Sequence, residues 1–306
     1  MLGTVIRAQS GFFWVQLDDT SEVLRCSLRG RLKKVRQYTD LATLGDRVQV
    51  TAVSPGEGAV ESVEPRRTKL ARKSPKGGGW FEQIIVANID LVLITFAVAN
   101  PEPHVRMIDR FLVVAEENGI EVAIIANKCD LADDYAQRVF SVYQKIGYSV
   151  LFTSAATGQG IESVRDLIRG KISAFSGPSG VGKSSLLNKI QPGLTLRTGA
   201  ISAALNKGQH TTVAAELIPL HEGGWVADTP GIRELGLHQI PADQVEWCFR
   251  EFRPFLGECA FANCTHDHEP NCAIRAAVKR GDISIERVES YLKLYQEAGA
   301  ALGVRS

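Results

Sequence analysis

A glycine-rich stretch in the middle of the chain constrains the fold more than any other feature. Residues 177–184 read Gly-Pro-Ser-Gly-Val-Gly-Lys-Ser and fit the phosphate-binding pattern G-x-x-x-x-G-K-[ST]. The run Ile172–Ser176 before it is typical of a strand, and Ser184–Ile190 after it is typical of a helix. In this context the backbone N–H groups of the loop and the helix N-terminus surround a phosphate. The sequence therefore predicts a nucleotide-binding α/β domain around a mostly parallel sheet.

A second motif, at the end of the predicted strand Glu121–Ala126, indicates which base is bound. Asn127-Lys128-Cys129-Asp130 has the form N-K-x-D of a guanine-reading loop. Asp130 is able to accept two hydrogen bonds from guanine, from N1–H and the 2-amino group, and adenine lacks this pair. We expect Asn127 to fix the loop and contact the base, and the stem of Lys128 to pack on the ring.

A matching pair of residues follows the next predicted strand, Ser149–Phe152. Ser154 and Ala155, which begin 24 residues after Asp130, resemble the backbone loop that contacts the guanine oxygen. An isolated N-K-x-D occurs by chance in helices and loops, whereas one at a strand end, followed by a matching Ser-Ala, is specific. We therefore predict GTP rather than ATP as the nucleotide.

The order of these motifs is unusual. In most GTPases the phosphate loop comes first and the guanine loop fourth, but here the guanine loop precedes the phosphate loop by 50 residues. A third motif, Asp228-Thr229-Pro230-Gly231, resembles the D-x-x-G loop beside the metal and the γ-phosphate. The parts of one site are present, but the chain enters the fold at a different strand. The sequence predicts a circularly permuted GTPase domain whose D-x-x-G segment leads into a further region.

The phosphate motifs assign expected contacts to individual residues. We expect Lys183 to reach the β- and γ-phosphates and the Ser184 hydroxyl to bind Mg²⁺. Asp228 is expected to hold Mg²⁺, directly or through water, and the Gly231 N–H to meet the γ-phosphate. The predicted phosphate-contacting set is Gly177, Pro178, Ser179, Gly180, Val181, Gly182, Lys183, Ser184, Ser185, Asp228 and Gly231.

A switch-like stretch, Gln191–Thr212, lies between the phosphate loop and the D-x-x-G motif and ends in Gly-Gln-His-Thr-Thr. Thr211 and Thr212 are both candidates for the threonine that contacts Mg²⁺ in the GTP state. Ile232 stands where Ras-like proteins have the glutamine that orients the attacking water, so intrinsic hydrolysis should be slow. His210 is the nearest polar candidate for catalysis, and a structural or partner-contacting role is its alternative.

The N-terminal region, residues 1–70, has the pattern of a small OB-type barrel. Its predicted strands are Thr4–Ala8, Phe12–Leu17, Glu22–Leu28, Arg47–Val53 and Ala59–Val63. The first 76 residues hold 14 basic and 8 acidic residues, and the remainder hold 21 and 26, which favours a nucleic-acid partner over a merely solvated face. Phe12, Phe13 and Trp14 are candidates for base stacking, although alternation should turn about half of such aromatics into the barrel.

The composition of the remaining chain predicts three further segments. Residues 71–82 are basic and glycine-rich, which predicts a linker, and residues 83–237 alternate strands with helices as the permuted GTPase domain requires. Residues 238–306 are expected to be mainly helical, with helices at Ala273–Lys279 and Ile285–Gln296. There is no run of 18 apolar residues and no export signal, so we expect a cytoplasmic protein without a membrane span.

Three of the six cysteines cluster in the C-terminal region. Cys259, Cys264, His266 and Cys272 supply three thiolates and one imidazole within 14 residues, a ligand set typical of a closed structural zinc site. His268 is an alternative to His266, and the spacing does not decide between them. A reducing compartment favours metal binding over disulfides for such a cluster.

Taken together, these motifs resemble the ribosome small-subunit-dependent GTPase A family, the circularly permuted GTPases also called RsgA or YjeQ. The resemblance covers essentially the whole chain and rests on the guanine-loop-first order and on four segments: residues 177–185, 208–212, 228–231 and 259–274. It implies an OB barrel, a permuted GTPase domain and a zinc domain. It also implies a role in late maturation of the small ribosomal subunit, with hydrolysis stimulated by the subunit. The family's proposed catalytic histidine corresponds to His210.

The resemblance thus predicts a monomeric GTP hydrolase with Mg²⁺ and one structural Zn²⁺, whose partners are the small subunit and its rRNA. Hydrolysis is expected to drive release from the subunit. One alternative is a permuted GTPase acting on another RNA partner, such as the large subunit. Another is an RNA-binding scaffold with a static nucleotide. A P-loop kinase or ATPase is disfavoured by Asn127 to Asp130.

Overall fold

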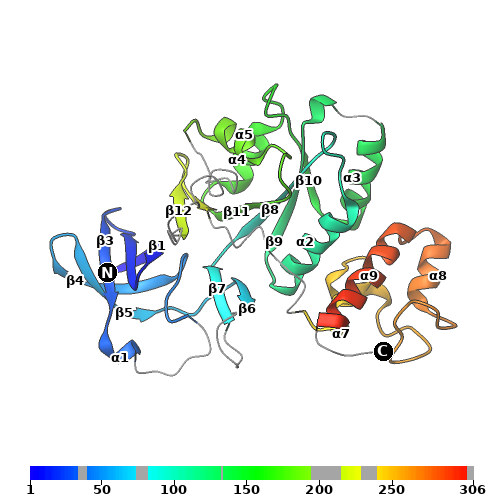
Figure 1. Cartoon of the computed structure of the whole chain (residues 1–306), viewed down its shortest axis with the longest axis horizontal. Helices are drawn as coiled ribbons and strands as arrows, with labels where there is room; N and C mark the ends of the chain where they lie inside the picture. The colour runs from blue at the N-terminus through cyan, green and yellow to red at the C-terminus, as the bar shows by residue number, and fades with distance from the viewer. Residues whose placement is uncertain (34–39, 74–81, 132–133, 194–214, 229–239, 302–306) are drawn as a thin grey trace, which may run out of the picture.

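A computed structural model of the 306-residue chain describes residues 1–33, 40–73, 82–131, 134–193, 215–228 and 240–301. An N-terminal barrel, a central α/β domain and a C-terminal helical region follow one another, as Figure 1 shows. Among the helices in the described ranges, none combines the length and the apolar character that crossing a membrane requires.

The predicted five-stranded barrel is confirmed. Its strands pair in the order β1-β2-β3-β5-β4, and β4 pairs back to β1, which closes the barrel. Alternate residues of each strand fill the interior, among them Val5, Phe13, Val15 and Cys26. The strands are β1 (Leu2–Gln9), β2 (Phe12–Leu17), β3 (Val23–Leu28), β4 (Arg47–Ser54) and β5 (Glu57–Val63), with the short helix α1 (Gly30–Lys33) after β3.

A hairpin not expected from the sequence flanks the basic glycine-rich segment. Strands β6 (Lys69–Lys73) and β7 (Glu82–Ala87) pair antiparallel, so the predicted linker 71–82 overlaps the ends of both strands. The hairpin is fastened to the barrel because the Ala87 N–H donates to Leu44 O (2.8 Å) and Asn88 Nδ2 donates to Gly45 O (3.0 Å). A Cβ on Gly45 would lie 2.1 Å from Ala87 O, so only glycine allows this approach.

The central domain is the predicted α/β sheet, in the order β10-β9-β8-β11-β13-β12. Within this sheet all neighbouring strands pair in parallel, except that β12 pairs antiparallel with β13. The strands are β8 (Leu91–Ala97), β9 (Glu121–Asn127), β10 (Ser149–Phe152), β11 (Ile172–Ser176), β12 (Ala215–Pro219) and β13 (Trp225–Asp228). Helices α2 (Val105–Glu117), α3 (Asp134–Ile146), α4 (Ile161–Ile168) and α5 (Lys183–Ile190) cover the sheet, and η1 (Cys129–Leu131) follows β9.

The burial of strand β8 shows why helices cover both faces of the central sheet. It is buried along its whole length, with Ile94 and Phe96 in one apolar cluster and Leu91 and Leu93 in another. The first cluster contains residues of α2 and α3, and the second contains residues of α4 and α5. A strand whose successive side chains point to opposite faces therefore holds one helix pair on each side of the sheet.

The barrel and the GTPase domain share one continuous sheet. Strand β12 pairs with β1 through Arg7 opposite Glu216 and Ala8 opposite Ala215. Glu216 in turn lies opposite Asp228 on β13. The described residues thus form an 11-stranded sheet in which β12 joins the barrel to the strand that carries the D-x-x-G aspartate.

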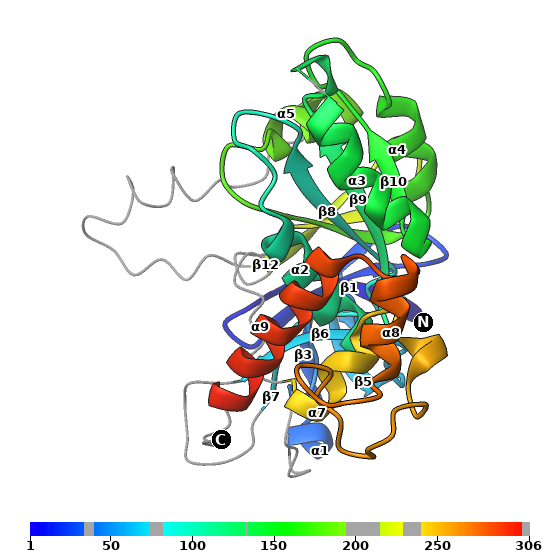
Figure 2. The same ribbon diagram turned by 90° about the vertical axis from the view of Figure 1, so that its right-hand side faces the viewer.

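The C-terminal region is mainly helical, as predicted, and packs against α2. Figure 2 shows its long helix α9 lying beside α2. Glu116 on α2 accepts hydrogen bonds from Arg250 (2.6 Å) and Arg253 (2.7 Å). The elements are α7 (Ala242–Val245), η4 (Glu246–Cys248), η5 (Arg253–Phe255), α8 (Ala273–Arg280) and α9 (Ile285–Ala301).

A buried arginine fixes this packing. The Arg287 side chain on α9 is 2% exposed and forms ion pairs with Asp109 on α2 and with Glu251, whose Oε1 lies 2.5 Å from Nε. Tyr143 on α3 also donates a hydrogen bond to Asp109 (2.7 Å). Burial alone would lower the pKa of Arg287, but the two carboxylates raise it above its ordinary value, so the guanidinium is charged.

We expect Arg287→Met to destabilise the protein by about 3–5 kcal/mol, because it leaves Asp109 and Glu251 buried without their partner. Equilibrium denaturation in urea measures this. Arg280→Met, which removes an exposed arginine paired with Asp282, is the matched control and should cost less than about 1 kcal/mol. Equal losses in both variants would contradict a structural role for the buried network.

Candidate nucleotide site and metal centre

The sequence motifs meet at one edge of the central sheet. Asn127 ends β9, Ser154 follows β10, Gly177 follows β11 and Asp228 ends β13. Because these strands are parallel, their carboxyl ends lie side by side, where open α/β sheets bind ligands. The permuted order along the chain therefore still assembles one site.

The phosphate loop has the backbone geometry of an anion cradle. Gly177, Gly180 and Gly182 all have positive φ, at 135°, 81° and 92°. A Cβ on Gly177 would lie 2.1 Å from Thr95 O, so the loop packs on β8 only because that residue is glycine. Lys183 opens α5 and donates from Nζ to the carbonyls of Gly177 (2.7 Å) and Pro178 (2.6 Å). Its ammonium is thus held over the loop, beside a helix N-terminus that favours anions.

Asn127 links the guanine motif to the phosphate loop. It is 1% exposed, and its Nδ2 donates to Val181 O (2.9 Å) while its Oδ1 accepts from Thr153 Oγ1 (3.0 Å). A Cβ on Gly182 would lie 2.5 Å from Asn127 Nδ2, so this glycine permits the contact. The motif asparagine therefore joins three strand ends. Thr153, which orients it, is a site residue that the sequence reasoning missed, although it directly precedes the recognised Ser154.

The remaining guanine-motif residues border this junction. The Asp130 carboxylate, in an exposed residue on η1, accepts a hydrogen bond from Ser154 Oγ. Lys128 has φ 62°, and its ammonium bonds Asn100 O in the loop between β8 and α2. Ala155 follows Ser154 at the start of a turn and is partly exposed. The structure thus brings the N-K-x-D and Ser-Ala segments together, as their spacing predicted.

Two of the four predicted magnesium ligands lie in the described part of the chain. Ser184 is in the first turn of α5, and Asp228, 8% exposed, ends β13 next to β11. A hydroxyl and a carboxylate at the mouth of a phosphate loop fit the oxygen ligands that Mg²⁺ takes. Thr211 and Thr212, together with His210 and Gly231, lie outside the described residues.

The cysteine cluster has the dimensions of a tetrahedral metal site. The four candidate ligand atoms of Cys259, Cys264, His266 and Cys272 all lie within 4.8 Å of one another. His266 Nδ1 is 3.6 Å from Cys259 Sγ and 3.4 Å from Cys272 Sγ, and those two sulfurs are 4.0 Å apart. A zinc tetrahedron with ordinary bond lengths has S···N edges of about 3.5 Å and S···S edges of about 3.8 Å. The cluster therefore fits a metal of this kind.

The structure decides between the two histidines. His266 is 3% exposed, whereas the side chain of His268 is 82% exposed. His266 Nε2 contacts Glu246 Oε2 at 2.9 Å, the carboxylate partner that metal-bound histidines commonly have. His266, and not His268, belongs to the cluster.

Neighbouring groups hold the cluster's loop in place. The N–H groups of Ala273 and Arg275, at the start of α8, point at the sulfurs of Cys259 (3.4 Å) and Cys272 (3.5 Å). Thr265 donates twice to the Glu269 carboxylate. Burial would raise the pKa of Glu269, but these hydrogen bonds lower it to about 2, so the Glu269 carboxylate stays ionised near neutral pH.

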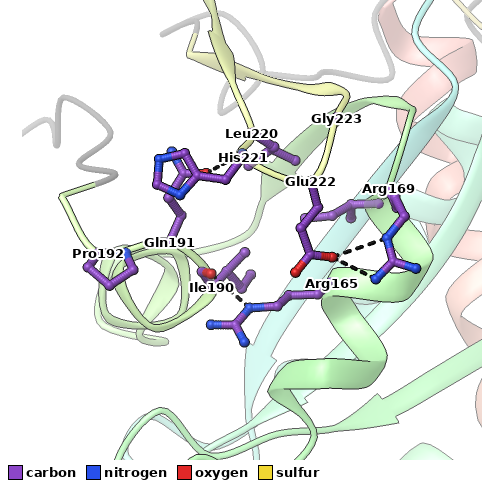
Figure 3. Close-up of a pocket in the computed structure, with 10 residues that line it drawn as sticks. Arg165, Arg169, Ile190, Gln191, Pro192, Leu220, His221, Glu222 and Gly223 are labelled. Atoms are coloured by element: carbon purple, nitrogen blue, oxygen red, sulfur yellow. Dashed lines mark hydrogen bonds and ion pairs between the residues drawn. The ribbon is translucent and has the colours of Figure 1, made fainter.

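None of the residues that line a separate hollow of about 260 Å³ belongs to these sites, and Figure 3 shows its lining. It is bounded by the ends of α4 and α5 and by the β12–β13 turn, at the opposite end of the sheet from Gly177. Its arginines are engaged in holding these elements together: Arg165 Nε donates to Ile190 O (2.8 Å), and Arg169 pairs with Glu222 (2.6 Å). These contacts join the end of α4 to the end of α5 and to the β12–β13 turn.

Comparisons with known proteins cover nearly the whole chain. The family model described as RsgA GTPase matches residues 63–238, and the one described as RsgA N-terminal domain matches residues 2–60. The chain is 49% identical to the small ribosomal subunit biogenesis GTPase RsgA of Gemmatimonas aurantiaca, over 96% of each chain. It is 44% identical to the protein of the same name from Moorella thermoacetica, over 97% of each chain.

Two solved structures share the fold. YjeQ from Thermotoga maritima superposes with a TM-score of 0.81 at 36% identity, covering 99% of both chains. YloQ, described as a circularly permuted GTPase, gives 0.76 at 29% identity and covers 98% of this chain and 95% of its own. With its motifs assembled at one sheet edge in permuted order, the chain belongs to the RsgA family and is a GTPase.

Proposed function

We propose that this GTPase acts in biogenesis of the small ribosomal subunit, in the cytoplasm and as a monomer. The observation that carries the proposal is the full-length similarity to relatives named for that role. The architecture supports it. The N-terminal barrel is of a type that binds nucleic acid, and its strands belong to the same continuous sheet as the strands that carry the nucleotide site. Its proposed partners are the subunit's rRNA and GTP or GDP.

The proposed nucleotide contacts follow the geometry of the sheet edge. Asp130, Asn127 and the Ser154-Ala155 segment would read guanine, and Lys128 would pack on the ring. The loop 177–185 would hold the phosphates through its N–H groups and Lys183. Mg²⁺ would neutralise charge on the β- and γ-phosphates. Its proposed ligands are Ser184, Asp228 and one of Thr211 and Thr212.

Hydrolysis is proposed to depend on the ribosomal partner. Ile232 offers no polar group to the attacking water, so free protein should turn over slowly. We propose that the subunit stimulates the reaction, that His210 orients or deprotonates the water, and that loss of the γ-phosphate drives release. The zinc proposed at Cys259, Cys264, His266 and Cys272 is structural, because four protein ligands leave no open position.

We expect purified small subunits to stimulate GTP hydrolysis strongly and large subunits to have no comparable effect. His210→Ala should lower the stimulated rate by on the order of 100-fold, the usual contribution of a general acid or base. Multiple-turnover phosphate release measures both effects. GTP affinity and subunit binding, measured in parallel, should be unchanged in the variant.

Other outcomes point to the alternatives. Stimulation by large subunits would favour a permuted GTPase with a different ribosomal partner. No turnover above background with either subunit would favour an RNA-binding scaffold with static nucleotide. A stimulated rate that is unchanged in His210→Ala would assign that histidine a structural or partner-contacting role.

A further inference from the structure

The loop between β8 and α2 borders both nucleotide-binding motifs, although neither motif includes it. The Val98 N–H donates to Asn127 O (2.9 Å), which ties the start of the loop to the guanine motif. A Cβ on Gly180 would lie 3.9 Å from Pro101 Cδ, so the same loop also lies beside the phosphate loop. Residues 98–101 are therefore placed to affect the half of the site that reads the base and the half that holds the phosphates.

The Lys128 side chain runs from the guanine motif to this loop. Its Nζ donates a hydrogen bond to Asn100 O. Its Cε lies beside the phosphate loop, since a Cβ on Gly182 would be 3.9 Å away from it. The aliphatic stem is therefore held across Gly182, with the backbone of the guanine motif at one end and Asn100 at the other.

The contribution of Asn100 comes from its backbone. The atom that accepts from Lys128 is the main-chain oxygen, and Asn100 itself is exposed. Its φ is 48°, in the left-handed region, where asparagine is enriched and β-branched residues are strained. Because φ and ψ set the direction of the carbonyl, the position requires a backbone conformation and not an amide side chain.

We propose that Asn100 is a positioning residue for guanine binding, whose carbonyl holds the Lys128 stem in place before the nucleotide arrives. A free lysine side chain has many rotamers, and it loses them when it packs on a ring. Holding the stem in the free protein removes part of this cost from the binding step. The inference rests on the proposed function in one respect, the packing of Lys128 on the guanine ring.

The test measures the Kd of the full-length protein for GDP that carries a fluorescent ribose label, together with steady-state GTP turnover. Asn100→Val strains the left-handed backbone and should weaken GDP binding by about 5- to 10-fold, the cost of immobilising one long side chain. KM for GTP should rise while kcat at saturating GTP stays unchanged. Asn100→Gly loses the same amide but adopts positive φ readily, so it should keep the wild-type affinity.

Ser10→Val is the matched control for backbone strain. Ser10 is exposed in the β1–β2 turn of the barrel and has a similar φ of 52°. The valine there should lower the melting temperature, as Asn100→Val does, but leave GDP affinity unchanged. Equal losses of affinity in Asn100→Val and Asn100→Gly, or no loss in Asn100→Val, would overturn the role of Asn100.

A double-mutant cycle shows whether Asn100 acts through Lys128. Lys128→Met keeps an apolar stem but removes the ammonium, so adding Asn100→Val to it should weaken GDP binding no further. Additive effects of the two substitutions would overturn the inference and leave the proposed base contacts intact. Asp130→Asn tests those contacts separately, because unchanged GTP affinity in that variant would contradict the proposed guanine site itself.

Discussion

Removing the proposed zinc from the C-terminal region should unfold that region. A structural zinc in a small cluster contributes on the order of 10 kcal/mol of folding free energy, which exceeds what so small a helical region gains by packing alone. Here the proposed ligands are also part of the core, since Cys272 belongs to the same buried apolar cluster as Phe252 and Tyr291, and the His266 ring contacts both of those rings. We therefore expect a strong chelator, or Cys272→Ser, to expose residues 240–301 to proteolysis and to lower the melting temperature.

Metal content by mass spectrometry should show one zinc per chain in the wild type and much less in Cys272→Ser. Cys248→Ser is the matched control, because this cysteine is buried in the same region but outside the cluster. Burial raises the pKa of Cys248 to about 12, so it stays a neutral thiol and should not affect metal content. A wild-type protein that purifies without stoichiometric metal and ignores the chelator would contradict a structural zinc site.

Loss of this region should also disturb α2. Arg287 and Arg250 join the C-terminal region to acidic residues of α2, and the loop before α2 contains Asn100, the backbone partner of Lys128. The C-terminal region is therefore packed on an element adjacent to the guanine motif. This packing was not predictable from the D-x-x-G connection alone, because Asp109 and Arg287 are 178 residues apart.

Local patterns predicted most of the fold. The run Ile172–Ser176, the alternation in Phe12–Leu17 and the helical pattern of Ala273–Lys279 each depend on neighbours in the sequence, and the structure confirms them as β11, β2 and α8. The phosphate and guanine motifs could likewise be placed at strand ends. Their assembly follows from parallel pairing, which the βα alternation already implied.

Features that depend on distant partners were missed. Strand β6 is basic and polar, and it becomes a strand because Leu70 packs inward and pairs with Val86 of β7. The pairing of β12 with β1 joins residues more than 200 positions apart and leaves no periodic signal. The choice of His266 over His268 likewise depended on which ring is buried beside the three sulfurs, which spacing between cysteines does not encode.

Replacing Asp130 by asparagine should change which nucleotide the protein binds. Guanine donates two hydrogen bonds to the carboxylate, and their loss should weaken GTP binding by about 3–6 kcal/mol, or roughly 100- to 10,000-fold. Xanthine carries an oxygen in place of the 2-amino group, which the asparagine amide is able to meet as a donor. The variant should therefore bind and hydrolyse xanthosine triphosphate in preference to GTP, as titration calorimetry and phosphate release would show.

Asp134→Asn tests whether the effect is local, because it removes another exposed carboxylate only four residues away, in the first turn of α3. It should leave GTP affinity within about 2-fold, since an exposed charge at this distance is largely screened. If Asp130→Asn bound GTP as well as the control does, the N-K-x-D segment would not be the base-reading loop. Tight binding of ATP by the wild type would lead to the same conclusion, because adenine offers no pair of donors to Asp130.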